Sequence, residues 1–214
     1  MDNLLTYSVL CFTTLFTLMD PLGTMPLFLE MTKGQSERER RAIALKACTV
    51  TFIILVLFTL SGRYLFEFFG ISIDGFRIVG GVIIFKIGYD MLQAHFTHVK
   101  LNADEQKSYS DDITITPLAI PMLCGPGAIA SGITLMADAP DIAFKTVLIC
   151  AIAIVCFVSF IILCASSRLL KLLGETGNNV MMRLMGLILM VIAVECFVSG
   201  IRPILTDIIR QATV

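Results

Sequence analysis

The protein has 214 residues, of which 57% are hydrophobic and only 15% are charged, and its net charge at pH 7 is −1. Soluble domains carry about 25% charged residues, whereas residues 113–137 and 146–167 contain none. Each of these runs is long enough to cross roughly 30 Å of hydrocarbon as a helix, so the composition excludes a soluble protein. The near-neutral charge also argues against a nucleic-acid partner.

Six apolar segments are expected to form membrane-spanning helices, which makes this an all-α integral membrane protein. In chain order they are residues 4–31, 42–62, 72–92, 113–137, 143–167 and 183–201. The first begins with Met-Asp-Asn rather than a basic segment, and no small-residue cleavage site follows it. We therefore interpret it as a retained helix and not as a signal peptide.

The longest polar interval, residues 93–112, divides the chain into two halves with three predicted spans each. We expect this interval to be a cytoplasmic linker between a first repeat at 1–92 and a second repeat, with a short C-terminal tail, at 113–214. The halves are weakly similar, because the pattern Arg-x-x-Gly occurs near the start of the third span of each, at 77–80 and at 183–186.

The basic residues predict the orientation, because cytoplasmic loops are enriched in Lys and Arg. With the N-terminus outside, ten of them fall on the cytoplasmic side: Lys33, Arg38, Arg40, Arg41, Lys46, Lys100, Lys107, Arg168, Lys171 and Arg183. Four fall on the outer side: Arg63, Lys145, Arg202 and Arg210. This predicts a multi-pass protein of the inner (cytoplasmic) membrane with both termini outside. Since each half has an odd number of spans, the halves form inverted-topology repeats, as in many secondary transporters.

The first and fourth spans are interrupted at corresponding positions. The first contains "DPLGTMP" at 20–26, and the fourth contains "PMLCGPGAIASG" at 121–132. Proline lacks an N–H and clashes with the preceding turn, and glycine adopts backbone shapes that other residues resist. The freed backbone groups cannot face lipid, so they face protein or a polar cavity. Matched interruptions of this kind indicate a transporter's binding site; two structural kinks are the alternative.

The two breaks differ in the charge that they can hold. Asp20 occupies the N-cap position of a half-helix that begins at Pro21, so its carboxylate can fill that positive end or face a substrate ammonium. The half-helix that begins at Pro126 offers only backbone N–H groups and a positive dipole end, which suit a carboxylate. Together they fit a small zwitterion. The predicted substrate-binding residues are Asp20, Gly23, Thr24, Gly125, Gly127, Ala128 and Ser131, and the predicted helix-breaking residues are Pro21, Pro26 and Pro126.

Other polar residues have open interpretations. The hydroxyls of Thr24 and Ser131 can contact substrate or bond to a preceding carbonyl. Glu195 lies within the sixth span and has two interpretations. It is either a coupling site for a proton or cation, or an acid that is hydrogen-bonded to a neighbouring helix. No metal or cofactor site is expected, because the seven cysteines lie in predicted spans without a C-x-x-C pattern and His95 and His98 lie in a polar loop. No phosphate-binding loop, nucleophile motif or dinucleotide fingerprint indicates an enzyme.

Four ordered segments carry a family resemblance: Asp20-Pro-Leu-Gly followed by Pro26, "FGISIDGFRIVGG" (69–81), "PLAIPMLCGPGAI" (117–129) and "RLMGLILMVIAVECFVSGI" (183–201). Over nearly its whole length the chain resembles the MarC family of bacterial and archaeal inner-membrane proteins, many of which have Asn where Asp20 stands. The resemblance implies two inverted three-helix repeats within the group of LysE-like exporters. For some members it implies transport of small neutral amino acids such as glycine, alanine, serine and threonine.

The predicted function is a secondary transporter of small neutral amino acids, coupled to protons or sodium, with the substrate held between the breaks of spans 1 and 4. The expected partners are a small zwitterion, the lipid bilayer and a coupling ion, and a homo-oligomer is compatible with the sequence. The alternatives are a channel or passive small-solute pore, an exporter linked to antibiotic resistance, and a membrane scaffold that transports nothing.

Overall fold

The computed structural model describes residues 4–93 and 114–212, and every regular element in these ranges is a helix. In chain order these are α1 (Leu4–Met19), α2 (Pro21–Met31), α3 (Glu37–Phe69), α4 (Ile73–Gln93), the π-helix η1 (Thr114–Leu123), α6 (Pro126–Asp138) and α7 (Ile142–Ala212). The predicted all-helical class is thus confirmed for these ranges. The predicted linker lies outside them except for Gln93, and so do His95 and His98.

Within the described residues, four stretches are long and apolar enough to cross a membrane, and they match the first, second, fifth and sixth predicted spans. They are Leu4–Met31, Glu37–Phe69, Ile142–Ser166 and Asn179–Gln211. The third predicted span forms α4, which is less apolar because it carries Asp74, Arg77, Lys86 and Asp90. The fourth is divided into η1 and α6, as its break predicted.

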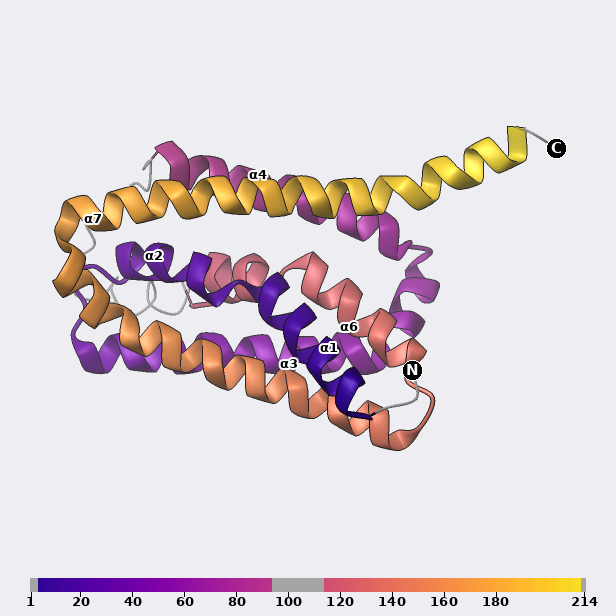
Figure 1. Cartoon of the computed structure of the whole chain (residues 1–214), viewed down its shortest axis with the longest axis horizontal. Coiled ribbons are helices and arrows are strands. Elements are labelled where there is room, and N and C mark those ends of the chain that lie inside the picture. Colours follow the sequence, from indigo (N-terminus) through magenta and orange to yellow (C-terminus); the bar gives the residue numbers. More distant parts are fainter. Residues whose placement is uncertain (1–3, 94–113, 213–214) are drawn as a thin grey trace.

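The fifth and sixth predicted spans belong to one continuous helix of 71 residues, α7. This helix turns back on itself between two arms (Figure 1), which we call the N-arm (Ile142–Ser166) and the C-arm (Asn179–Gln211). The sequence between the arms contains no proline, but it has two glycines, Gly174 and Gly177, which permit a sharp bend more readily than other residues.

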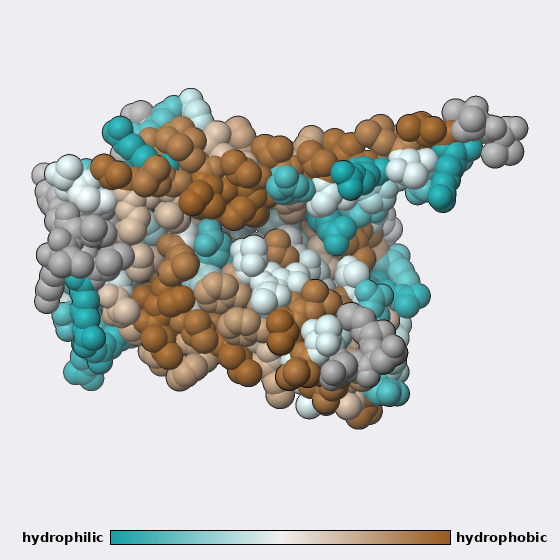
Figure 2. Space-filling view, in the orientation of Figure 1, coloured by the Kyte–Doolittle hydropathy of each residue, from teal (hydrophilic) through white to brown (hydrophobic). Residues whose placement is uncertain are grey.

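The helices form three layers (Figure 1). One outer layer contains α3 and the N-arm, the other contains α4 and the C-arm, and the interrupted helices lie between them. Each layer therefore pairs an element of the first half with the corresponding predicted span of the second half. Strongly hydrophobic residues cover much of the two outer layers, while hydrophilic residues gather towards the two ends of the molecule (Figure 2).

The α4 helix and the C-arm run antiparallel with their backbones in contact. A Cβ at Gly81 would lie 2.7 Å from the carbonyl oxygen of Ala193, and a Cβ at Gly88 would lie 2.8 Å from that of Gly186. Gly200 meets the first turn of α4 in the same way. These contacts recur every seven residues, or about two helical turns, and only glycine permits so close an approach.

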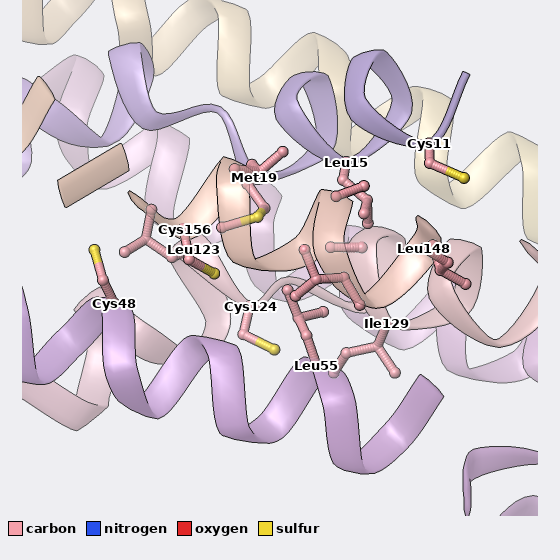
Figure 3. Close-up of a cluster of buried hydrophobic side chains, with 14 of the residues drawn as sticks. Cys11, Leu15, Met19, Cys48, Leu55, Leu123, Cys124, Ile129, Leu148 and Cys156 are labelled. Atoms are coloured by element: carbon pink, nitrogen blue, oxygen red, sulfur yellow. The ribbon is translucent and has the colours of Figure 1, made fainter. Parts of the chain in front are cut away.

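A core of aliphatic and sulfur-containing side chains joins the middle layer to the layer of α3 and the N-arm. The α1 helix buries every fourth residue towards it, namely Tyr7, Cys11, Leu15 and Met19. Figure 3 shows three of these beside Leu123 and Cys124 at the second break, with Leu55 of α3 and Leu148 of α7 on the other side. All seven cysteines are free thiols and five of them are buried, as expected of small apolar side chains.

Candidate functional site

The first break lies at Asp20, between α1 and α2. Asp20 has φ 38° and ψ 63° and is the only residue other than glycine with positive φ in the described ranges. Pro21 disfavours a right-handed helical conformation in the residue before it, and aspartate is among the few residues that tolerate the left-handed one. The carbonyl oxygen of Asp20 then accepts the N–H of Thr24 at 3.0 Å, which begins α2.

The Asp20 carboxylate caps α2 with one oxygen and leaves the other unpaired. Its Oδ1 accepts the N–H of Gly23 at 3.0 Å, which confirms the predicted N-cap. Its Oδ2 is buried and has no hydrogen-bond partner among the described residues. Because an unpaired buried carboxylate oxygen is costly, this oxygen is suited to a cationic ligand or a proton.

Gly23 makes room for this carboxylate. A Cβ at Gly23 would lie 2.0 Å from Oδ2 of Asp20, so any larger residue displaces the cap. Thr24 is almost fully buried, and its hydroxyl donates to the carbonyl oxygen of Asp20 at 3.0 Å. Pro26 was predicted to break the helix, and this prediction is wrong, because Pro26 lies inside α2. Its missing N–H removes only the bond to Leu22, in the first turn of the helix.

We expect Gly23→Ala to destabilise the protein by about 1–3 kcal/mol, because the new methyl group forces the Asp20 carboxylate out of its capping position. Thermal unfolding of the purified protein in detergent measures this. Leu22→Ala is the matched control, since Leu22 directly precedes Gly23 and its side chain is exposed. Equal melting temperatures for Gly23→Ala and wild type would mean that the carboxylate does not occupy this position.

The second break lies at Cys124 and Gly125, between η1 and α6. Gly125 is the N-cap of α6 in an extended conformation (φ −73°, ψ 160°), Pro126 is the first helical residue, and no side chain caps the helix. The N–H groups of Gly127 and Ala128 belong to the first turn and have no acceptor within the helix. The predicted contrast between an acid-capped break and a bare one is therefore present.

The start of α6 packs against three other elements, α1, α4 and the C-arm. A Cβ at Gly127 would lie 3.3 Å from Cδ2 of Leu18, near the end of α1, and 3.8 Å from Sγ of Cys196 on the C-arm. Gly80 of α4 lies directly under the ring of Pro126, where a Cβ would be 1.7 Å from Cγ. Since Leu18 precedes Asp20 by two residues, the structure brings the two breaks into one region of the middle layer.

Ser131 lies near this region on α6, whereas Glu195 is linked to it only in sequence, through Cys196. Ser131 is half-buried on α6, about one turn after Gly127, whereas the hydroxyl of Thr134 donates to the carbonyl oxygen of Ala130 at 2.9 Å. Glu195 is exposed in the middle of the C-arm and forms no hydrogen bond or ion pair with the described residues. It directly precedes Cys196, which contacts Gly127.

A cavity of about 590 Å³ opens between the turn that joins α3 to α4 and the far end of α6. Ile133 and Thr134 of α6 line it, together with Ser72 and the ion pair between Arg63 and Glu67 (3.1 Å). It lies one to two turns along α6 from Gly127. This cavity could not be predicted from the sequence, because its walls come from segments far apart in the chain. The same holds for the wall that Leu18, Gly80 and Cys196 form around the start of α6.

Comparisons with known proteins agree over nearly the full length of the chain. Residues 5–205 match the family model described as MarC family integral membrane protein. The UPF0056 membrane protein YvbG of Bacillus subtilis is 40% identical, over 92% of this chain and 96% of its own. The UPF0056 membrane protein MJ1677 of Methanocaldococcus jannaschii is 36% identical over 92% and 97%. No solved structure matches significantly. The protein therefore belongs to the MarC family of integral membrane proteins.

Proposed function

We propose that this protein is a secondary transporter of small neutral amino acids, which binds its substrate between the broken helices. The proposal rests on the buried Oδ2 of Asp20, which has no partner among the described residues, and on the uncapped start of α6, which packs beside Leu18, two residues before Asp20. A cation-binding group and an anion-binding group within one membrane-embedded region match the two charged ends of a zwitterion.

Each end of the amino acid has its own partner in this proposal. The ammonium group donates to Asp20 Oδ2 in a charge-assisted hydrogen bond, and the carboxylate accepts the N–H groups of Gly127 and Ala128. Leu18 and Cys196, the side chains nearest to Gly127, carry no charge and leave little space. These neighbours favour a substrate with a small, uncharged side chain. Gly23, Thr24, Gly125 and Ser131 complete the proposed site.

The layered arrangement supports an inverted repeat. Helices α1 and α2 correspond to η1 and α6 in the middle layer, α3 corresponds to the N-arm, and α4 to the C-arm. Alternating access would follow from movement of one repeat against the other around the paired breaks. With both termini outside the inner membrane, the cavity beside Arg63 opens to the outer side and forms the outer entrance.

Glu195 is the proposed coupling group, because it is an unpaired acid in the middle of a membrane-spanning arm. We expect Glu195→Gln to abolish uphill accumulation driven by a proton or sodium gradient, while exchange of labelled for unlabelled substrate continues. Proteoliposomes loaded with or without substrate separate the two activities, and Asp207→Asn, an exposed acid near the end of the C-arm, is the control. Unchanged accumulation by the Glu195→Gln variant would exclude a coupling role.

The decisive experiment is uptake by proteoliposomes of a panel of labelled amino acids, with and without proton and sodium gradients. We expect saturable uptake of glycine, alanine, serine or threonine that is accelerated by substrate on the opposite side. Flux that neither saturates nor responds to counter-substrate would identify a passive pore instead. An absence of uptake across the panel would contradict the proposed transport of neutral amino acids.

A further inference from the structure

A second feature of interest is a small cavity at the opposite end of the bundle from the large one. It has a volume of about 60 Å³ and lies between the start of α3 and the end of the N-arm. Three arginines, Arg40, Arg41 and Arg168, line it together with Glu37, so positive charge predominates. Hydrophilic residues are visible at this end of the lower layer in Figure 2.

The arginines lie where the apolar spans end. Arg41 is in the second turn of α3, and Arg168 follows the last residue of the N-arm by two positions. Both side chains are exposed, whereas Arg40 is half-buried and donates from Nε to the carbonyl oxygen of Thr32 at 3.2 Å. Arg41 and Arg168 are thus the two guanidinium groups best placed to reach an anion at the level of the lipid headgroups.

An apolar groove of about 270 Å³ occupies the outer surface of the same two helices. Its α3 wall includes Leu45 and Phe52, which follow Arg41 by four and eleven residues and so share its helix face. Its α7 wall includes Phe157 and Phe160, which precede Arg168 by about three and two turns. The groove therefore continues from the basic cavity towards the apolar interior of the membrane.

We infer that this surface binds an anionic phospholipid, with its phosphate between Arg41 and Arg168 and an acyl chain in the groove. Guanidinium groups form bidentate hydrogen bonds with phosphate oxygens, and basic pockets between membrane helices bind anionic lipid headgroups. The groove selects a lipid over a free phosphate ion, because only a lipid supplies an apolar chain attached to the anion. This site is separate from the proposed substrate site and does not depend on transport.

The test is the melting temperature of the detergent-purified protein with dioleoyl phosphatidylglycerol, dioleoyl phosphatidylcholine or inorganic phosphate. At about ten times its dissociation constant, phosphatidylglycerol is expected to raise the melting temperature by about 3–6 °C. Arg41→Gln/Arg168→Gln is expected to weaken its binding by about thirtyfold and remove the shift. Arg202→Gln/Arg210→Gln removes the same charge at the other end of the bundle and should preserve the shift. Native mass spectrometry of bound lipid provides a second readout.

Filling the groove separates the acyl chain from the headgroup. Ala153→Phe places a large side chain on the groove wall and is expected to weaken phosphatidylglycerol binding while all arginines remain. Equal shifts with phosphatidylcholine, an equal shift with phosphate alone, or an undiminished shift in the Arg41→Gln/Arg168→Gln variant would overturn the inference. So would a change from dimer to monomer on Ala153→Phe, because the groove would then be covered by a second copy of the chain.

Discussion

Asp20→Asn is expected to leave the protein folded and to weaken its affinity for the transported amino acid by about 10–100-fold. Asparagine tolerates the left-handed conformation at this position, and its side-chain oxygen can still accept the N–H of Gly23. What the substitution removes is the negative charge at the buried Oδ2. A hydrogen bond to a charged group contributes about 1.5–3 kcal/mol, which corresponds to the expected loss.

Two further variants separate charge from fold at this break. Asp20→Ala removes both the cap and the charge, so it should lower the melting temperature as well as the affinity, whereas Asp20→Asn should lower only the affinity. Asp138→Asn removes a carboxylate from the exposed end of α6 and should change neither. Affinity and transport rate come from uptake at varied substrate concentration. An unchanged affinity in Asp20→Asn would mean that position 20 acts through its conformation and not through its charge.

The first break could be predicted because its causes are local. Proline after Asp20 and glycine three residues after it define an N-cap, a first helical residue and a small residue within the first turn. The positive φ of Asp20 and the contact between its Oδ2 and Gly23 could not be predicted from these residue types. They depend on the conformation that Asp20 adopts where the chain leaves α1, because Pro21 disfavours the right-handed helical conformation there but allows both the extended and the left-handed one.

The contacts around the second break were harder to predict from the sequence. The bare N-terminus at Pro126 followed directly from "CGPG", because glycine offers no capping group and proline suits the first position. The contact of Gly80 with the Pro126 ring and that of Cys196 with Gly127 join residues separated by tens of positions. The pattern Arg-x-x-Gly drew attention to Gly80 without indicating its partner.

The continuity of α7 was also not predicted. Hydropathy shows where a chain leaves the hydrocarbon layer of the membrane, but it does not show whether the helix ends there.

Pro26 shows how a local rule can fail inside a helix. A proline in the second turn removes one backbone bond, and here the acceptor that loses its donor belongs to Leu22, whose side chain is exposed. The surrounding residues of α2 are buried on several sides, so packing maintains the helix through the proline. The interruption of the helix is therefore confined to Asp20 and Pro21.

Gly127→Val is expected to abolish uptake without unfolding the protein. Gly127 is half-buried, and a Cβ there would be 3.3 Å from Leu18 and 3.8 Å from Cys196, a tight but tolerable fit. The two further methyl groups of valine would occupy the space in front of the first-turn N–H groups and exclude a substrate carboxylate. Gly127→Ala is the matched control and should retain uptake.

Substrate analogues can then assign each break to one end of the zwitterion. Propionate lacks the ammonium group of alanine and alanine amide lacks its carboxylate, so each should compete for only one half of the site. Binding is measured as the rise in melting temperature of the detergent-purified protein, because Gly127→Val is expected to have no uptake to inhibit. We expect Asp20→Asn to weaken stabilisation by alanine amide and to spare that by propionate, and Gly127→Val to weaken stabilisation by propionate more strongly. If Gly127→Val blocked uptake while Asp20→Ala and Asp20→Asn left it unchanged, the carboxylate of Asp20 would have no part in holding substrate. The site would then be an anion site alone, at the start of α6.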